Sequence, residues 1–456
     1  MTDSDMGDEA LVAFLREHPD IRACVASMAP AVENADGDLG EADAAEERLV
    51  EDMRHRGLAA LQGWAERRVA ATERDIRRQP SIRRQGKKTP LAQQIRRRRG
   101  PGAAVPVGDG AGAPVRPRGE GQPAGLSRPL QRAIVDFAAD QPFAQARAKL
   151  REHYGIGIGE STIQRITFGH AEAMFEAGRG GAAYPDAPGE RRPIVVQTDG
   201  GMVPTVAPDP AAADKRKSKT LSWREAKLSL AHVQGSVTPV YAGSIAGGVE
   251  AAGRQLPACA VRAGFGTGSR VHAVGDGAAW IVGQVEQQFG GQARYLIDFY
   301  HVCEYLSAAA TGIWPADTAA REAWIETQKA ALKAGRLDAV LQALAAQCEA
   351  PEVEDEQAPV RNCHRYLSGR RTQLDYSRAL ADGLLIGSGE IESAHRYVAQ
   401  QRLKRPGAWW RVENAEYMLA LRIVRINGDW EAYCRDRARN AAANDNPARR
   451  AGRRVA

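Results

Sequence analysis

Short apolar runs that end in an acid recur in the middle of this 456-residue chain. The run PIVVQTD ends at Asp199 and the run SRVHAVGD ends at Asp276, and glycine follows each acid. Short apolar runs bounded by turn-forming residues are typical of buried strands. A third run, ARYLIDFYH, predicts a strand that passes into a helix. Because strands that alternate with helices are usually buried in one sheet, the pattern predicts an α/β core.

Further elements are predicted around these runs. MVPTVA, KLSLAHV and SVTPVYAGS carry the β-branched and apolar residues that favour strands. Residues 247–264 and 278–289 have helical patterns, and residues 301–385 are almost wholly helical in pattern. A last group of helices begins after the GSG sequence at 387–389. We therefore expect an α/β core that contains a helical insertion.

The net charge of +6 conceals a division along the sequence. Residues 1–52 carry a net charge of −12, so the remaining residues carry +18. Between Arg67 and Arg99 there are thirteen cations and two acids. This density favours contact with the phosphates of nucleic acid, because clustered Lys and Arg attract polyanions. A solvated basic face is the alternative interpretation.

Other features exclude whole classes of protein. No apolar run approaches the ~18 residues that a transmembrane helix needs. The N-terminal sequence MTDSDMGDEALVAF lacks the basic flank and apolar stretch of a signal peptide. The six cysteines are scattered and form no CxxC pair, which argues against a disulfide framework and against zinc. We therefore expect a cytoplasmic protein with no membrane association and no zinc.

A helix-turn-helix outline lies within residues 143–166. One predicted helix ends near Tyr154, and a second begins after the glycines at 155–159. The second helix carries Gln164 and Arg165 on its outer side. This outline is typical of DNA-binding regions and also of plain helical hairpins, so both interpretations stay open.

Three acids lie where an α/β sheet builds its sites. Asp199 and Asp276 are predicted at the C-terminal ends of two strands, and their glycine neighbours allow a ligand to approach closely. The third acid, Glu390 or Glu392, opens the helix after IGSG. Carboxylate oxygens are the ligands that Mg²⁺ prefers, and two such ions can catalyse displacement at phosphorus. The pattern therefore predicts a metal-dependent phosphoryl-transfer site.

Only one of the two glutamates can face the aspartates. They are two residues apart, so on a helix they point about 200° away from each other. Ile391, Ala394 and Val398 form the apolar stripe of this helix, and Glu390 lies slightly nearer to its centre. The helical wheel therefore leans weakly to Glu390, although an acid at a helix N-terminus is also favoured by the helix dipole alone.

Seven segments, in order, resemble one family. They are QTDGGMVP, W-R-E at 223–225, VGDGAAWI, LIDFYHVCEYL, IGSGEIESAH, QRLKRPGAWW and LALRIVRINGDW. Together they are similar to the bacterial insertion-sequence transposases of the ISKra type, which are DDE enzymes related to the Mutator-like group. The resemblance covers residues 193–435, is loose over 50–180 and is absent over 1–50.

The resemblance implies a fold, an activity and partners. The fold is a ribonuclease-H-like mixed-sheet core with a helical insertion, preceded by a helical N-terminal DNA-binding region. The activity is Mg²⁺-dependent cleavage of DNA at transposon ends and strand transfer into target DNA, with Mn²⁺ as a substitute ion. The partners are double-stranded DNA, as terminal inverted repeats and as target, and further copies of the chain in a dimer or larger assembly at the nucleoid.

The resemblance also gives each acid a role. Asp199 is the first metal ligand and Asp276 the second, and the GSGxxE spacing makes Glu392 the third. Asp298 and His301 match an Asp-x-x-His element of Mutator-like enzymes. The implied catalytic and metal-binding set is Asp199, Asp276 and Glu392, with Asp298, His301 and Glu390 as candidates for active-site support.

The predicted DNA-contacting side chains are cations and one glutamine. Those near the C-terminus lie among tryptophans, a mixture that suits the DNA backbone and unstacked bases. A helix end with core tryptophans is the alternative interpretation there. The full set is Arg77, Arg78, Arg83, Arg84, Lys87, Lys88, Arg96, Arg97, Arg98, Arg99, Gln164, Arg165, Arg370, Arg371, Arg402, Lys404 and Arg411.

The expected organisation has seven parts. They are an acidic arm (1–50), a basic helical segment and linker (51–125), a helix-turn-helix-like region (126–185), the first part of the core (190–300), the helical insertion (301–385), the closing helices with the third acid (386–435) and a basic tail (436–456). Two alternatives to a transposase stay open. One is a transposase-derived DNA-binding protein without catalysis, and the other is a ribonuclease-H-like nuclease without strand transfer.

Overall fold

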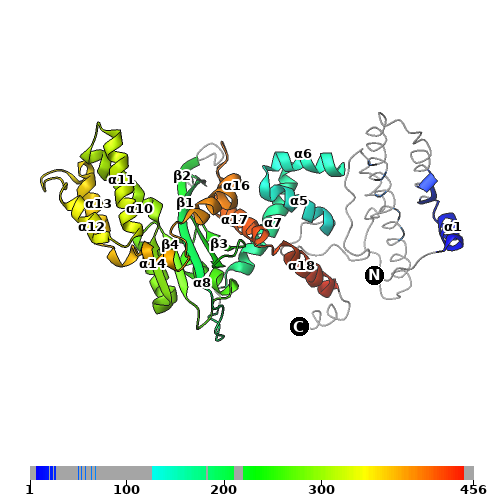
Figure 1. Cartoon of the computed structure of the whole chain (residues 1–456). Coiled ribbons are helices and arrows are strands. Elements are labelled where there is room, and N and C mark those ends of the chain that lie inside the picture. Colours follow the sequence, from blue (N-terminus) through cyan, green and yellow to red (C-terminus); the bar gives the residue numbers. More distant parts are fainter. Residues whose placement is uncertain are drawn as a thin grey trace, which may run out of the picture. The chain divides into compact units, whose positions relative to one another are not determined.

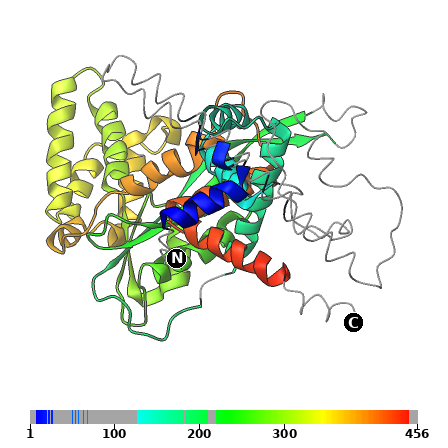
Figure 2. The same ribbon diagram turned by 90° about the vertical axis from the view of Figure 1, so that its right-hand side faces the viewer.

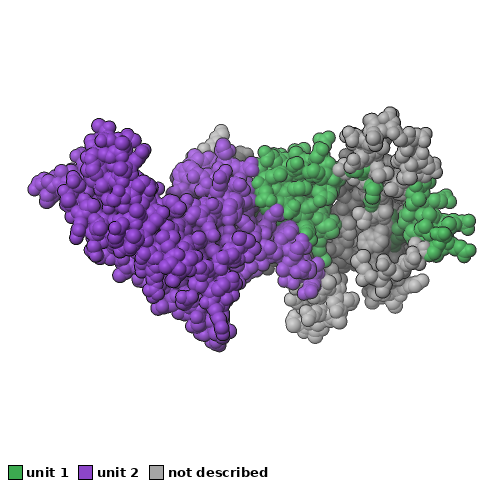
Figure 3. All heavy atoms as spheres, viewed as in Figure 1, with its two compact units in different colours: residues 1–169 green, residues 170–456 purple. Residues whose placement is uncertain are grey.

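The computed structural model in Figure 1 describes residues 7–19, 21–23, 25–26, 126–180, 183–209 and 219–445, together with the single positions 50, 53, 57, 63 and 67. The chain divides into two compact units, residues 1–169 and 170–456 (Figure 3). Ten of the predicted DNA-contacting cations lie outside the described residues: Arg77, Arg78, Arg83, Arg84, Lys87, Lys88, Arg96, Arg97, Arg98 and Arg99. Their contact with phosphates stays a prediction.

The described part of the first unit is helical. It contains α1 (Asp8–Glu17), α5 (Arg128–Asp140), α6 (Phe143–Tyr154) and the start of α7 (Glu160–Gly178). Helix α6 ends at Tyr154 because Gly155 takes the left-handed conformation, with φ 63°, that commonly closes a helix. The two helices expected within 143–166 and the glycine-rich turn between them are therefore present.

The second unit contains a mixed five-stranded sheet in the order β3-β2-β1-β4-β5. The strands are β1 (Ile194–Pro208), β2 (Lys219–Val233), β3 (Val240–Ser244), β4 (Val271–Gly275) and β5 (Ala293–Ile297). Strand β2 is antiparallel to both β1 and β3, whereas β4 and β5 run parallel to β1. The prediction of an α/β fold is confirmed.

One strand prediction is wrong. PIVVQTD and MVPTVA belong to a single strand, β1, which continues through Asp199, Gly200 and Gly201. Strand β2 pairs with β1 along its whole length, and this ladder holds the glycine pair in an extended conformation. Asp199 therefore lies within a strand and not at its end.

Two helices cover one face of the sheet. They are α8 (Gly248–Arg262) and α9 (Ala279–Phe289). Ile194 and Val196 of β1 lie in a buried apolar cluster with residues of both helices. This cluster forms the core beneath the sheet.

The other face of the sheet receives the C-terminal helices. Successive strand residues point to opposite faces, so Gln197 and Asp199 point away from the face that carries Ile194 and Val196. Helices α15 (Gly389–Ala394) and α17 (Val412–Ile426) contact β1. The candidate third acid is thereby carried to the sheet.

Between β5 and α15 the chain forms a block of helices. They are α10 (Phe299–Ile313), α11 (Thr318–Lys333), α12 (Leu337–Ala345), α13 (Pro359–Ser368) and α14 (Tyr376–Ala381), with the 3₁₀ turns η3 (Asp355–Gln357) and η4 (Arg371–Gln373). These helices share a second apolar core with β5. Figures 1 and 2 show them gathered beside the sheet. The helices expected over 301–385 are therefore present.

A π-helical turn, η5 (His395–Gln400), follows α15 directly, and α16 (Gln401–Leu403) and α18 (Trp430–Asp445) complete the C-terminal part. The buried side chain of Arg422 donates to the carbonyl oxygens of Tyr397 and Val398 within this turn. Single π-helical turns are frequent at functional sites. Among the described residues, no helix is long and apolar enough to cross a membrane.

Candidate active site

The sheet brings the two predicted aspartates to the same place. Strands β1 and β4 run parallel, and their pairing ends at Gln197 opposite Val274. Asp199 and Asp276 each lie two residues beyond this last pair. Burial raises the pKa of the Asp199 carboxyl, and the negative charge of Asp276 raises that pKa further. The two carboxylates are therefore close enough to repel each other.

The backbone holds one oxygen of each aspartate. Asp199 Oδ1 accepts a hydrogen bond from Gly200 N at 2.7 Å, and Asp276 Oδ1 accepts one from Ala278 N at 2.8 Å. The Tyr366 hydroxyl donates to the carbonyl oxygen of Asp276 at 2.9 Å. These bonds orient both carboxylates. The Oδ2 atoms accept no hydrogen bond from the described residues, so they can face a ligand.

Gln197 holds α15 over the face that carries Asp199. Its side-chain oxygen accepts from Ile391 N at 3.0 Å, and its amide donates to Glu390 Oε2 at 3.5 Å. Glu390 Oε2 also lies 2.8 Å from Nε2 of the buried His232. Glu390 is therefore held against the sheet by two polar side chains.

Glu392 lies on the exposed side of the same helix. Burial raises the pKa of its carboxyl, and the charges of Asp298 and Asp199 raise that pKa further. The charges of these two acids therefore disfavour a negative charge on Glu392. The structure thus joins Glu390 to His232 and leaves Glu392 exposed. The helical wheel placed Glu390 nearer the buried face, and Glu390 is the less exposed of the two glutamates. Which of them is the third metal ligand stays a prediction.

Asp298 joins the block of helices to α15. Its side chain is buried, and Oδ1 accepts from Tyr300 N at 2.6 Å and from His301 N at 3.1 Å at the start of α10. Oδ2 accepts from the backbone N and the hydroxyl of Ser388, directly before α15. Both oxygens are therefore occupied by hydrogen bonds that link the start of α10 to Ser388. The role of Asp298 as active-site support stays a prediction. His301 lies close by, with Nδ1 3.4 Å from Glu304 Oε2.

His395 is a residue of the site that the sequence reasoning missed. It is the first residue of the π-helical turn, only 4% exposed, and its Nε2 lies 3.8 Å from Asp199 Oδ2. Neither ring nitrogen forms a hydrogen bond within the described part of the chain. Burial lowers the pKa of its imidazole. Its position three residues after Glu392, in the segment IGSGEIESAH, was the available signal.

An ion pair lies beside the aspartates. Glu225 and Lys227 of β2 form this pair, and the Lys227 side chain is buried, with Nζ 4.9 Å from the centre of a Trp280 ring. Burial and the charge of Asp276 raise the pKa of Asp199 most, and the charge of Glu225 raises that pKa a little further. Glu225 belongs to the W-R-E segment, whereas no pattern in the sequence singles out Lys227.

Trp223, Trp409 and Lys404 form an exposed group, here called the tryptophan cluster. The rings of Trp223 and Trp409 lie 6.0 Å apart at an interplanar angle of 67°. The Nζ atom of Lys404 lies 5.5 Å from the Trp223 ring centre. Trp223 is 50% exposed and Trp409 is 38% exposed, so both rings are accessible. A cation beside accessible aromatic faces suits stacking on an unpaired base.

Two neighbouring residues point inward. Arg402 is 3% exposed, and its guanidinium lies 4.8 Å from the Trp410 ring centre. Trp410 is buried, and its indole N–H donates to Leu403 O at 3.0 Å. Packing against Trp410 therefore buries the Arg402 guanidinium, and its contact with DNA stays a prediction that this burial does not favour.

The remaining predicted DNA contacts in the described residues are accessible to different degrees. Gln164 and Arg165 are exposed on α7, and Arg411 is exposed directly before α17. Arg371 forms an exposed ion pair, and Arg370 lies 4.1 Å above an aromatic ring. Exposure permits DNA contact by these residues and does not by itself establish it.

The chemistry of the donor set fits Mg²⁺. Asp199, Asp276 and Glu392 offer oxygen ligands. Burial, and then the charge of neighbouring acids, raise the pKa of Asp199 and Glu392, and a bound cation would offset that repulsion. Within the described ranges, no three His, Cys, Asp or Glu side chains converge closely enough to form a ready-made metal site.

Comparison with known proteins gives one match. Residues 267–437 match the family described as "Uncharacterised protein family (UPF0236)". The matched stretch includes Asp276, Glu392 and His395, whereas Asp199 lies before it. No curated protein matches the chain.

Proposed function

We propose that this chain is a DDE transposase with a ribonuclease-H-like core. One observation carries the proposal. Asp199 and Asp276 each lie two residues beyond the last paired residues of β1 and β4, and α15, which contains Glu392, packs on the sheet face that carries Asp199. The sheet, three antiparallel strands extended by two parallel ones, supports the ribonuclease-H-like fold. The resemblance of seven segments to ISKra-type transposases supports the reaction.

Asp199, Asp276 and Glu392 would hold Mg²⁺ or Mn²⁺, and these ions, when bound, activate the attacking oxygen and stabilise the leaving oxygen. The N–H groups of Gly200 and Ala278 keep each aspartate turned towards the DNA. In the first reaction, water attacks phosphorus and a 3′-hydroxyl leaves at the transposon end. In the second, that hydroxyl attacks a target phosphodiester, the bond from phosphorus to the target's 3′-oxygen breaks, and the target strand leaves with a free 3′-hydroxyl. Neither reaction needs a covalent bond to the protein.

The surfaces around the acids support DNA as the substrate. The tryptophan cluster would receive an unstacked base near the cut end, and the exposed Arg411 would contact a phosphate. Gln164 and Arg165 of α7 would contact the terminal repeats. Because two transposon ends must be held together, we propose a dimer or a larger assembly at the nucleoid.

A metal-dependent cleavage assay tests the proposal. DNA that carries the ends of the element should be nicked in Mg²⁺ by the native chain and not by Asp199→Asn, which should still bind that DNA. Asp186→Asn, at an exposed acid before β1, is the matched control and should cleave normally. Cleavage at the native rate by Asp199→Asn would overturn the site.

The same assay separates the two alternatives. A transposase-derived protein without catalysis would bind the ends and never nick them. A nuclease without strand transfer would nick them, yet would fail to join a pre-cut end to a plasmid.

A further inference from the structure

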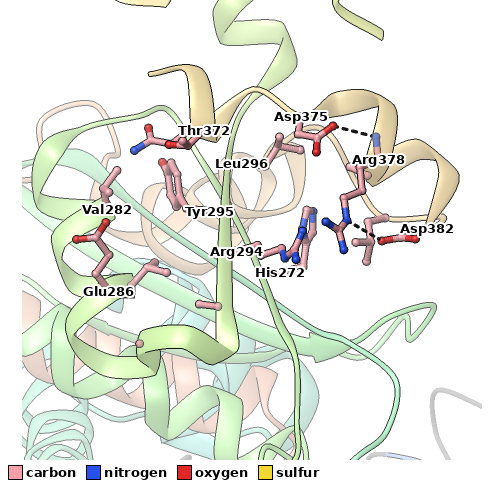
Figure 4. Close-up of a pocket in the computed structure, with 16 residues that line it drawn as sticks. His272, Val282, Glu286, Arg294, Tyr295, Leu296, Thr372, Asp375, Arg378 and Asp382 are labelled. Atoms are coloured by element: carbon pink, nitrogen blue, oxygen red, sulfur yellow. Dashed lines mark hydrogen bonds and ion pairs between the residues drawn. The ribbon is translucent and has the colours of Figure 1, made fainter. Parts of the chain in front are cut away.

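A cavity lies at the other end of β4 and β5 from the candidate active site. Its volume is about 350 Å³, within the range of small-molecule sites. It is lined by β5, by α9 and by the segment that runs from η4 to Leu384 (Figure 4). His272 and Arg294, each the second residue of its strand, contribute to it. Asp276, by contrast, follows the last residue of β4.

Cationic and imidazole side chains gather at one end of this cavity. Figure 4 shows Arg294, Arg378 and His272 pointing towards one another. Arg294 is exposed and forms no ion pair with any described residue. The Arg378 guanidinium has one ion-pair partner there, Asp382, at 3.8 Å from Nε to Oδ2. Asp375 also lines this end, and its Oδ1 accepts from Arg378 N and the Ser377 hydroxyl. Arg294, which has no ion-pair partner among the described residues, together with Arg378 can bind an anion.

The histidine adds a hydrogen-bond acceptor to this end. His272 Nε2 must donate to the carbonyl oxygen of Leu385, 2.7 Å away. In the neutral ring, Nδ1 is then an acceptor. Burial lowers the pKa of His272, which favours that neutral form. A ligand hydroxyl can donate to this nitrogen.

The other end of the cavity offers acceptors beside an apolar wall. Figure 4 shows Glu286 of α9 beside Val282, away from the arginines. Glu286 is exposed and forms no ion pair within the described ranges, so its carboxylate can accept from a ligand. Gln373 Oε1 is buried in the lining and has no hydrogen-bond partner among the described residues. The ring of Tyr295 lies between the two ends.

We propose that this cavity binds a nucleoside monophosphate. The phosphate would lie between Arg294 and Arg378. The base would lie along the ring of Tyr295, and the N–H groups of the base would donate hydrogen bonds to the Glu286 carboxylate. Guanine fits best, because its two adjacent N–H donors match the two oxygens of one carboxylate. Inorganic phosphate would bind the two arginines but would not reach Glu286. A nucleoside would bind Glu286 but would leave the arginines without an anion.

Isothermal titration of the full chain with GMP tests the proposal, with inorganic phosphate and guanosine as partial ligands. GMP should bind saturably and more tightly than either. Arg294→Gln should weaken GMP binding at least tenfold, which corresponds to about 1.4 kcal/mol. Glu286→Gln should weaken GMP binding and leave phosphate binding unchanged. Arg321→Gln, at a half-buried arginine of α11 outside the cavity, is the control and should bind GMP normally.

Hydrogen exchange locates the ligand on the chain. GMP should slow exchange over residues 290–297 and 372–384. The proposal is overturned if GMP gives no saturable binding, if Arg294→Gln binds it as tightly as the native chain, or if protection appears only elsewhere. Loss of duplex DNA binding in Arg294→Gln without any GMP binding would also overturn it, because the phosphate would then belong to DNA.

Discussion

The imidazole of His395 fills the space that a side chain at Gly201 would occupy. His395 Nδ1 lies 2.5 Å from the position of a Cβ atom at Gly201, and Nε2 lies 3.8 Å from Asp199 Oδ2. The π-helical turn after the candidate third acid therefore packs directly on the strand that carries the first acid. The glycine in this strand is required by that contact and not by a turn.

Substitution of Gly201 by alanine should test this contact. We expect Gly201→Ala to lower the free energy of unfolding by about 1–3 kcal/mol, because the added methyl group must displace the buried ring. Urea denaturation measures the change. The control is Gly283→Ala in α9, where a Cβ meets nothing within 4 Å, and alanine should be neutral or stabilising there. Equal stability of Gly201→Ala and the native chain would contradict the packing.

The two glutamates of α15 should behave differently. Glu392→Gln should lose both cleavage and strand transfer, because the proposed third metal ligand would lose its negative charge. Glu390→Gln should retain activity and lose about 1 kcal/mol of stability, since its bond to His232 is weakened. Cleavage assays and urea denaturation of both variants measure this. An inactive Glu390→Gln beside an active Glu392→Gln would reverse the assignment.

The tryptophan cluster should contribute to DNA binding. Trp223→Ala should weaken binding to DNA with an unpaired end by about 1–3 kcal/mol, the usual contribution of one stacked base. Binding to a fully paired duplex should change less, because its bases stay stacked. Fluorescence anisotropy with both DNAs measures the difference. Val237→Ser, at a position 93% exposed in the turn before β3, is the control. Equal losses on both DNAs would argue against base stacking.

His170 should make the stability of the second unit depend on pH. Burial, and then the charge of Arg437, lower the pKa of His170 to about 4 from 6.5. Between these values the unfolded chain binds a proton that the folded chain does not, so stability is complete above pH 6.5 and falls as the pH drops towards 4. The loss at pH 5 should be about 2 kcal/mol. In urea denaturation, His170→Gln should show a shallower fall over this range, and parallel profiles would contradict the prediction.

The presence of the strands and helices could be predicted from the sequence, because local patterns of apolar residues determine them. The runs ending at Asp199 and Asp276 lie in neighbouring strands, and helix α6 ends at Tyr154, before a glycine that closes it. The local pattern gave a wrong prediction at the Gly200–Gly201 pair, where it separated one strand into two. Glycine is common in turns, and only the pairing with β2 shows that the chain stays extended there.

Some residues of the candidate site could likewise be predicted from the sequence, and others only from the tertiary structure. The two aspartates could be named from the sequence, because an acid after an apolar run is a local feature. The tertiary structure decided which partners Glu390 has, since Gln197 and His232 come from strands far away in the sequence and bind it. It also buried Arg402 on Trp410 and brought His395 to Asp199. Contacts between distant segments carry no local signature, so the sequence determined which elements form and the packing of those elements decided which side chains meet.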